Sequence, residues 1–435
     1  MSKAESKAPK ATEIRAIKGT RDLVAPEVLL FQEVEAQARE VFRRYGFEEI
    51  RTPILEPTEL FARAVGEETD IVGKEMFTFL DRDERPICLR PEATASVARA
   101  YVEHRLWERP GTTKLYYQGP MFRRERPQKG RYRQFSQIGA EVLGSGLPQV
   151  DYELLEMLWT LLRACGLGDA ELLLNSIGCE ADRRRYTEAL RAALRPDIER
   201  MCADCRRRYE RNPLRVLDCK VEADQPIIAA LPTMLDYLDE PCRAHFSAVR
   251  TMLDEQGLPY RLAPRLVRGL DYYRRTAFEF VHGALGAQNA LLGGGRYDGL
   301  AQALGAPAQY SEGIGFALGE DRFVIAMQAA GRASPPRGIA AYIAALGPEL
   351  LPRALRLARE LREAGLAVEV GDAQRKLARQ LELAARTGAR SAVILGPDEV
   401  AREEATLREL GTGNQRAVAL AALAGELAQP AKAKP

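Results

Sequence analysis

The stretch MFRRERPQKGRYRQFSQIGAE, residues 121–141, decides the fold of this chain. Two strand-like runs, KLYYQGPMFRRE and RQFSQIGAEVLG, flank the loop RPQKGRY, in which Pro127 and Gly130 interrupt regular structure. Strands joined by so short a loop pair in opposite directions. The sequence therefore predicts an antiparallel hairpin, and a sheet of that kind around it.

The hairpin is unusually rich in cations for a segment that is built into a sheet. Guanidinium groups hold phosphate oxygens through two parallel hydrogen bonds. We expect Arg131 and Arg133 to share one face with Phe135, because alternate residues of a strand point the same way. Two cations beside a flat ring suit a nucleoside triphosphate, and a plain basic surface is the alternative that these residues leave open. The cations are Arg123, Arg124, Arg126, Lys129, Arg131 and Arg133.

Length and composition limit the class of protein. A chain of 435 residues predicts two or three domains. The net charge of +2 gives no overall field toward nucleic acid, so any such contact must be local. No apolar run is long enough to span a bilayer, and the polar N-terminus predicts no export. An odd number of cysteines, seven, favours a reduced cytoplasmic protein.

The pattern along the chain predicts its organisation. We expect a disordered N-terminus (1–13), an α+β catalytic domain on an antiparallel sheet (14–330) and a linker (331–338). Within the catalytic domain, residues 178–258 predict a mainly helical insertion. Alternating strands and helices over 339–427 predict a small, mostly parallel sheet covered by helices, an α/β domain. A frayed tail (428–435) follows.

Cysteine and histidine leave two interpretations open for metal. Four cysteines could form a zinc site centred on a CxxC pair, or they could be buried small apolar residues; they are Cys202, Cys205, Cys219 and Cys242. The three histidines are scattered, which excludes HExxH chemistry and favours structural roles; they are His104, His245 and His282.

Further polar clusters stand beside strand-like runs. Arg268 and Asp271 precede two tyrosines in LVRGLDYYRRTAFEF (266–280), where they predict either a polar pocket or the edge of the core. In RPEATA (90–95), Thr94 could cap a helix with Glu92 beside its dipole, or Glu92 could bind an ammonium group. The runs GGGRYDG and GIGFALG fail the dinucleotide pattern, and their glycines are compatible with tight turns and close strand packing.

These motifs together resemble the class II aminoacyl-tRNA synthetases, and among them the histidyl-tRNA synthetase family, over residues 14–425. IKGTRDL (17–23) and YGFEEIRTPILEP (45–57) resemble the first class II motif, FRRERPQKGRYRQF (122–135) the second and GIGFALGEDR (313–322) the third. LVRGLDYYRRTAFEF and GGGRYDGL are similar to segments of the histidine enzymes. The class II fold with a C-terminal anticodon-binding domain is what the resemblance implies.

The resemblance also implies roles for individual residues. Catalysis would fall to Arg123 and Arg268 on either side of the α-phosphate. ATP would be bound by Arg123, Glu125, Arg131, Phe135 and Arg322. Histidine would be bound by Glu92, Ala93, Thr94, Arg123, Gln137, Glu141, Arg268, Tyr272, Tyr273 and Tyr297. Within that set, Glu141 and Tyr273 would meet the imidazole nitrogens.

The implied reaction needs ATP as substrate with Mg²⁺, and no organic cofactor. Histidine is activated to its adenylate with release of pyrophosphate and then passes to the terminal ribose of tRNA(His). The loop RPQKG would reach the acceptor end of the tRNA, and a homodimer through the first motif is implied.

One position departs from the family pattern, and two alternatives remain. The middle residue of Glu92-Ala93-Thr94 is more often glycine, a change that we expect to be tolerated. A regulatory paralogue that lost catalysis is one alternative, although it lacks the C-terminal domain. A synthetase for threonine, proline or glycine is the other, and RGLDYY with GGGRYDG argues against it.

Overall fold

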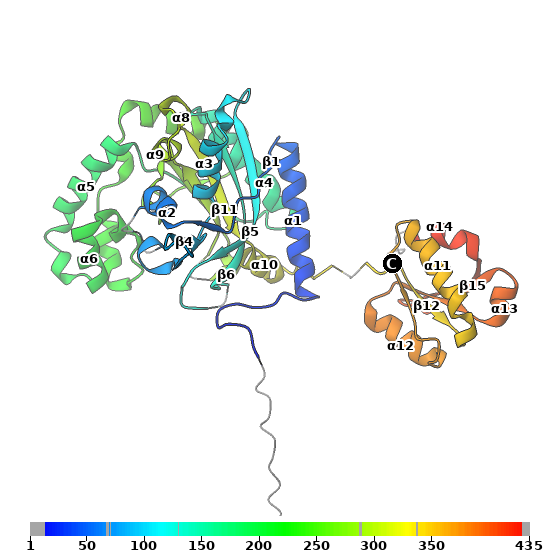
Figure 1. The fold of residues 1–435 in the computed structure, drawn as a ribbon. Coiled ribbons are helices and arrows are strands. Elements are labelled where there is room, and N and C mark those ends of the chain that lie inside the picture. Colours follow the sequence, from blue (N-terminus) through cyan, green and yellow to red (C-terminus); the bar gives the residue numbers. More distant parts are fainter. Residues whose placement is uncertain are drawn as a thin grey trace, which may run out of the picture. The chain divides into compact units, whose positions relative to one another are not determined.

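The computed structural model describes residues 14–66, 69, 71–128, 130–286, 289–335 and 338–428. The chain forms two compact units (Figure 1), with Phe31–Arg332 as the body of the first and the chain from Ala333 onward as the second. The segments 1–13 and 429–435, expected to be disordered and frayed, lie outside the described residues. Among the described residues, no helix is both long enough and apolar enough to cross a membrane.

The first unit is built on an eight-stranded sheet in the order β1-β5-β6-β11-β10-β9-β7-β8. Its strands are β1 (Glu48–Glu49), β5 (Thr113–Phe122), β6 (Gln134–Leu143), β7 (Glu171–Ser176), β8 (Arg261–Leu262), β9 (Arg274–Val281), β10 (Ala290–Arg296) and β11 (Gly313–Gly319). The inner pairings are antiparallel, and only the two edge pairings, β1 with β5 and β7 with β8, are parallel. The predicted hairpin is the β5–β6 pair, and the predicted class of sheet is confirmed.

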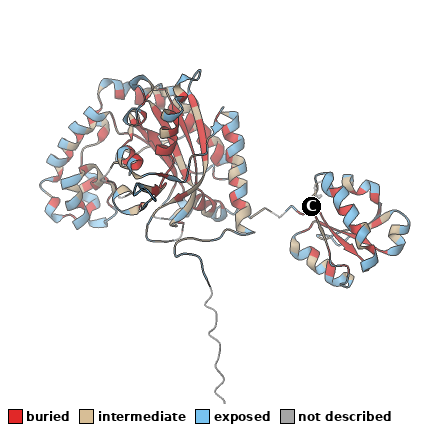
Figure 2. Cartoon of the chain, viewed as in Figure 1, coloured by how far each residue is buried: buried red, intermediate tan, exposed pale blue. Residues whose placement is uncertain are grey.

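Helices and a small sheet cover the two faces of this sheet. The helices are α1 (Glu27–Arg44), α2 (Thr58–Val65), α3 (Thr94–Glu103), α4 (Pro148–Ala164), α9 (Leu300–Ala303) and α10 (Glu320–Ala329). The small sheet has the order β2 (Leu55–Pro57), β4 (Pro86–Leu89), β3 (Phe77–Leu80). Leu115 and Tyr117 of β5 pack with residues of α2 and α3, whereas Tyr116 faces Phe42 of α1. Strand alternation thus sorts β5 into two faces, and none of its side chains is exposed (Figure 2).

The insertion is mainly helical, as predicted. It contains α5 (Glu180–Leu194), α6 (Ala203–Arg211), α7 (Gln225–Ala229) and α8 (Glu240–Glu255), with short 3-10 turns between them. Leucines and cysteines of these elements share a core of their own, which includes Leu190, Cys205, Cys219 and Cys242. Helix α8 also packs on α4. The insertion is therefore a small separate core attached to the main sheet.

The second unit has a five-stranded sheet in the order β13-β12-β14-β15-β16. Its elements are β12 (Ala341–Ala345), α11 (Leu351–Glu363), β13 (Val368–Val370), α12 (Leu377–Thr387), β14 (Ser391–Leu395), α13 (Pro397–Ala401), β15 (Glu404–Glu409), β16 (Gln415–Ala419) and α14 (Leu423–Ala428). Alternate residues of β12 face opposite cores, with Ile343 on the side of α11 and Tyr342 on the side of α12.

The α/β class is confirmed, but the expectation of a mostly parallel sheet is wrong. Strands β15 and β16 form an antiparallel hairpin, so two pairings are parallel and two are antiparallel. The turn between them contains Gly413 with a φ of 79°, a left-handed conformation that glycine adopts without strain. The short polar run GTGNQ, rather than a crossover helix, therefore sets the direction of the last strand.

Candidate active site

One face of the central sheet carries a row of small residues at the middle of the site. The strand register aligns Tyr117, Gly139, Ala317, Gly293 and Glu279 directly across β5, β6, β11, β10 and β9. Residues directly opposite one another across paired strands point to the same face. Three small residues therefore lie between a tyrosine and an acid, and they form the floor of a polar hollow.

Glycines in these strands leave room for polar groups from neighbouring segments. A β-carbon at Gly293 would collide with the guanidinium of Arg268, and one at Gly315 would collide with the Glu141 carboxylate. A β-carbon at Gly139 would collide with the hydroxyl of Tyr117. Gly293 of GGGRYDG and Gly315 of GIGFALG thus permit the close approach of functional side chains, whereas Gly299 lies in a turn with a φ of 98°.

A pocket of about 270 Å³ lies above this floor. Eleven of the residues predicted for the site line it: Glu92, Thr94, Arg123, Glu125, Arg131, Phe135, Gln137, Arg268, Tyr272, Tyr273 and Arg322. Three predicted residues, Ala93, Glu141 and Tyr297, are buried behind this lining. The structure brings together side chains that are separated by up to 230 positions in the sequence, from Glu92 to Arg322.

The second-motif residues form one side of the pocket. Glu125 lies between two guanidinium groups, with Arg131 Nη1 at 3.2 Å and Arg123 Nη1 at 3.8 Å from its carboxylate oxygens. The guanidinium carbon of Arg123 lies 5.3 Å from the ring centroid of Phe135, and Arg123 Nε donates to the carbonyl of Pro91. Two cations beside an aromatic ring are thus held in place by groups of the chain itself.

Arg133 does not join this side, and the prediction that it shares a face with Arg131 and Phe135 is wrong. Strand β6 begins only at Gln134, so strand alternation does not extend back to Arg133. The side chain of Arg133 instead donates to the carbonyl of Lys18 at 3.3 Å. The cation of Lys129 lies outside the described residues.

Arg268 forms the opposite side, together with an acid that the motifs did not indicate. Arg268 Nη1 donates to Glu279 at 3.0 Å, and Glu279 points to the pocket from β9. Among the described residues, the buried atoms Arg268 Nε and Gln137 Oε1 have no hydrogen-bond partner. Buried polar atoms usually have partners, so these two mark places where a ligand can bind. An acid between two phenylalanines in AFEF was the sequence signal for Glu279.

Glu92 and Thr94 hold the start of α3, with roles that differ from those expected for a helix cap. The Glu92 carboxylate accepts from the backbone N–H groups of Thr94 at 2.8 Å and Ala95 at 3.0 Å. The side chain of Glu92, which precedes the N-cap residue Ala93, therefore supplies the capping hydrogen bonds, and Thr94 does not. The Thr94 hydroxyl donates to Glu141 at 2.7 Å, and Tyr297 donates to the other oxygen of Glu141 at 2.7 Å.

This network shapes the charge of the site. Burial raises the pKa of Glu141 to about 8, against the effect of the hydrogen bonds from Tyr297 and Thr94. Burial likewise raises the pKa of Glu92, although the N–H groups at the start of α3 oppose the shift. Two buried carboxyl groups thus stand beside the pocket, and ionisation of one disfavours ionisation of the other.

The raised pKa of Glu141 predicts a pH-dependent stability. Its carboxyl group is harder to ionise in the folded chain, so its stabilising effect is complete below about pH 4.5 and is lost as the pH rises through about 8. We expect Glu141→Gln to gain stability relative to the parent over that range, by at most about 1.4 kcal/mol per pH unit. Urea unfolding of both proteins at several pH values measures the difference.

That comparison has a built-in control. Burial also raises the pKa of Glu320 to about 8, but Glu320 is present in both proteins and cancels in the difference. A stability difference that stays constant across the pH range would contradict the prediction.

The motif GGGRYDG has a structural arginine at its centre. Arg296 is fully buried, and its guanidinium donates to Asp151 at 2.7 Å and to the carbonyls of Ser145 and Leu147. His245 reaches the other oxygen of Asp151 at 2.9 Å. A buried ion pair with all its donors satisfied anchors α4 and α8 to the end of β10. This histidine has the structural role expected of it.

The four cysteines proposed for zinc do not all come together. Cys202, Cys205 and Cys219 lie close to one another with Asp224, whereas Cys242 lies with Cys179, Asp182 and Asp239. The inclusion of Cys242 is therefore wrong, because its place at the start of α8 puts it against α5 instead. All seven cysteines are free thiols.

An antiparallel sheet that carries these three motifs around one polar pocket defines a class II aminoacyl-tRNA synthetase. The family model described as histidyl-tRNA synthetase matches residues 19–322, and the model described as anticodon binding domain matches residues 340–429. The chain therefore belongs to the histidyl-tRNA synthetase family, and it is a histidine–tRNA ligase.

Individual relatives agree with this assignment. The chain is 56% identical to the histidine–tRNA ligase of Koribacter versatilis (strain Ellin345), over 94% of this chain and 95% of the relative. It is 55% identical to that of Solibacter usitatus (strain Ellin6076), over 92% and 96%. The crystal structure of apo S. aureus histidyl-tRNA synthetase superposes with a TM-score of 0.79 at 35% identity, covering 95% of this chain and all of that chain.

Proposed function

We propose that Arg123 and Arg268 bind the α-phosphate of ATP from opposite sides while the carboxylate of histidine attacks its phosphorus. Pyrophosphate leaves, and the aminoacyl group then passes from the adenylate to a hydroxyl of the terminal ribose of tRNA(His). Both steps need charge stabilisation and alignment rather than a protein nucleophile. The observation that carries this proposal is that both guanidinium groups line one pocket, and that the Nε of Arg268 has no hydrogen-bond partner among the described residues.

The remaining pocket residues divide between the two substrates. Phe135 and Arg322 would enclose the adenine ring, Glu125 would accept from its amine, and Arg131 would meet the outer phosphates. The unpartnered oxygen of Gln137 would accept from the ammonium group of histidine, with Glu92 supplying negative charge nearby. Tyr273 and Glu141 would meet the two imidazole nitrogens, and Tyr272 and Tyr297, which pack edge to face with centroids 5.8 Å apart, would shape the pocket.

Mg²⁺ enters, on this proposal, as part of the substrate MgATP and supplies positive charge at the outer phosphates. The three carboxylates of the lining that stand nearest to the pocket's cations each already have an arginine partner. These pairs are Glu125 with Arg131, Glu279 with Arg268 and Asp321 with Arg21. Among the described residues of the lining, these three carboxylates are therefore not free ligands, and the phosphates would supply most of the coordination.

For tRNA, we propose two contact regions. A basic hollow beside the pocket is lined by Lys74, Arg124, Arg126 and Arg131, and it would guide the acceptor end toward the adenylate. The second unit, which matches the anticodon binding domain, would contact the anticodon. Its boundaries, 339–427 after a linker, remain part of the proposal.

We also propose a cytoplasmic homodimer. Four large apolar side chains are exposed around the small sheet of the first motif: Ile54, Leu55, Phe79 and Leu80. Exposed apolar groups gathered in one region suit a protein interface. Sedimentation of the purified protein would give its assembly state.

Histidine-dependent exchange of pyrophosphate into ATP tests the proposed chemistry directly. We expect exchange with histidine and none above background with threonine, proline or glycine, because a pocket that hydrogen-bonds a substrate group rejects analogues without it. Exchange supported equally by another amino acid would contradict the proposed imidazole pocket.

A further inference from the structure

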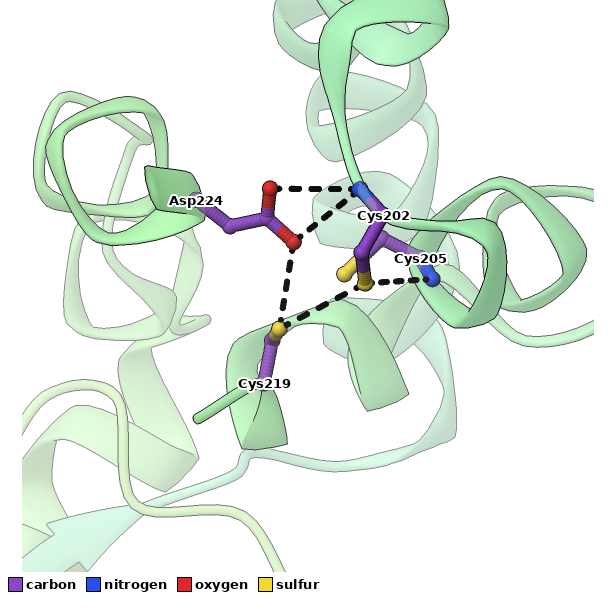
Figure 3. Close-up of side chains that lie close together, drawn as sticks. All are labelled: Cys202, Cys205, Cys219 and Asp224. Atoms are coloured by element: carbon purple, nitrogen blue, oxygen red, sulfur yellow. Dashed lines mark hydrogen bonds between the residues drawn. The ribbon is translucent and has the colours of Figure 1, made fainter. Parts of the chain in front are cut away.

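A second polar cluster lies in the helical insertion, apart from the residues that line the active-site pocket. Cys202, Cys205 and Cys219 converge with Asp224, and their ligand atoms all lie within 4.8 Å of one another (Figure 3). The four residues come from separate short elements: Cys202 and Cys205 at the start of α6, Cys219 after the 3-10 helix Pro213–Asp218, and Asp224 at the end of the next turn. The fold therefore assembles one donor set from three segments.

The distances fit a tetrahedral metal ion rather than a disulfide. Cys202 Sγ and Cys219 Sγ are 3.8 Å apart, far beyond an S–S bond of about 2.0 Å. Tetrahedral Zn–S bonds of about 2.3 Å would hold two sulfurs about 3.8 Å apart. Asp224 Oδ2 lies 3.2 Å from Cys219 Sγ, which is compatible with the shorter Zn–O bond.

Backbone N–H groups point to two of the three sulfur atoms. The backbone N–H of Cys205 points to Cys202 Sγ at 3.4 Å, and that of Val221 points to Cys219 Sγ at 3.4 Å. Cys202 is also the N-cap of α6, where the helix dipole favours negative charge. Such N–H groups around the ligands stabilise a metal-bound thiolate.

Asp224 provides an independent argument. Its residue is only 2% exposed, and no Lys, Arg or His among the described residues forms an ion pair with it. Its carboxylate accepts from Cys202 N and from the thiol of Cys219. A buried carboxylate without a cation is costly, and a divalent ion would supply the missing positive charge.

The neighbouring cluster around Cys242 does not share this property. Asp182 accepts from the backbone N–H groups of Cys179 and Asp239 and pairs with Arg185. Asp239 accepts from the backbone N–H of Cys242 at 2.9 Å. Those carboxylates are used as helix caps and have a cation, so this cluster needs no ion and provides a matched control.

We propose that Cys202, Cys205, Cys219 and Asp224 bind one Zn²⁺ ion, which joins α6 to the turns that follow it and fixes the insertion. Three soft sulfur donors and one carboxylate select zinc over the hard cations. On binding, the three thiols release their protons to solvent and four coordinate bonds form, with no change of oxidation state. The site is structural, because all four positions are filled by the protein.

The test is the metal content of the full chain after reconstitution with zinc under reducing conditions and removal of free metal. We expect about one zinc per chain for the parent and for Cys242→Ser, and a loss of most of it in Cys219→Ser and Asp224→Asn. With Co²⁺ in place of zinc, the parent and Cys242→Ser should show the intense visible bands of tetrahedral thiolate-bound cobalt.

The cobalt spectrum of the parent keeps the test valid even if a cysteine variant fails to fold. A parent protein without stoichiometric metal, equal metal in Cys219→Ser and the parent, or a Cys202–Cys219 disulfide in place of metal would each overturn the proposal. Exchange activity with histidine, measured alongside, identifies variants whose catalytic unit has remained intact.

Discussion

Replacement of Arg268 by alanine should slow formation of histidyl-adenylate by about 100- to 1,000-fold, the effect of removing one preorganised donor from a developing negative charge. Histidine affinity should change little, because this guanidinium is proposed to act on the phosphate. Single-turnover adenylate formation and equilibrium dialysis with histidine measure the two quantities. Arg261→Ala is a suitable control, since it removes an exposed arginine that pairs with Glu171.

The single variant also leaves Glu279 without its partner. A partly buried acid that loses its cation can disturb a site by itself. The double variant Arg268→Ala with Glu279→Gln removes that effect. If the double variant recovered the parent rate, the loss in the single variant would come from the stranded acid, and the proposed role of Arg268 would be wrong.

Above about pH 8, where Glu141 is ionised, its replacement by glutamine should weaken histidine binding by about 10- to 100-fold, the difference between a charge-assisted and an ordinary hydrogen bond. ATP affinity should stay near that of the parent. Glu125→Gln is the reciprocal variant, for which we expect weaker ATP binding with histidine affinity retained. Calorimetric titration with each substrate measures both affinities.

The geometry makes this test informative. Glu141 is fully buried, and each of its oxygens already accepts a hydrogen bond, from Thr94 and from Tyr297. A carboxylate oxygen has a second lone pair, so an imidazole N–H can still be accepted. Unchanged histidine affinity in Glu141→Gln would mean that the acid only positions Thr94 and Tyr297 and does not contact the substrate.

The sequence was most informative where local chemistry determines structure. Alternation on both sides of Pro127 and Gly130 was enough to predict the β5–β6 hairpin. The order of the eight strands was not predictable from such patterns, because β9 pairs with β7 and β11 pairs with β6, which lie far away in the chain. Within the C-terminal unit, the short polar run before β16 was not recognised as the turn of an antiparallel hairpin.

The site shows the same division. The arginines of the second motif could be identified from the sequence, since clustered guanidinium groups next to a strand need a reason. For Glu279 the sequence offered only an acid between two phenylalanines, and its pairing with Arg268 depends on the register of β9 with Gly293. Arg133 was placed on the wrong face because it precedes β6, and a loop residue does not follow strand alternation. Asp224 escaped notice because its three thiol neighbours meet it only after the insertion folds.

The glycines in the strands beneath the active site limit how the amino-acid specificity of the enzyme can be redesigned. At Gly139, Gly293 and Gly315 the space that a side chain would fill is occupied by the head groups of Tyr117, Arg268 and Glu141. A mutational scan would mark these glycines as intolerant and invite their assignment as substrate contacts. Their intolerance instead reflects that the space is already filled by these three side chains. A changed amino-acid specificity therefore has to be engineered at residues that line the sides of the pocket, and not at the glycines of the sheet below it.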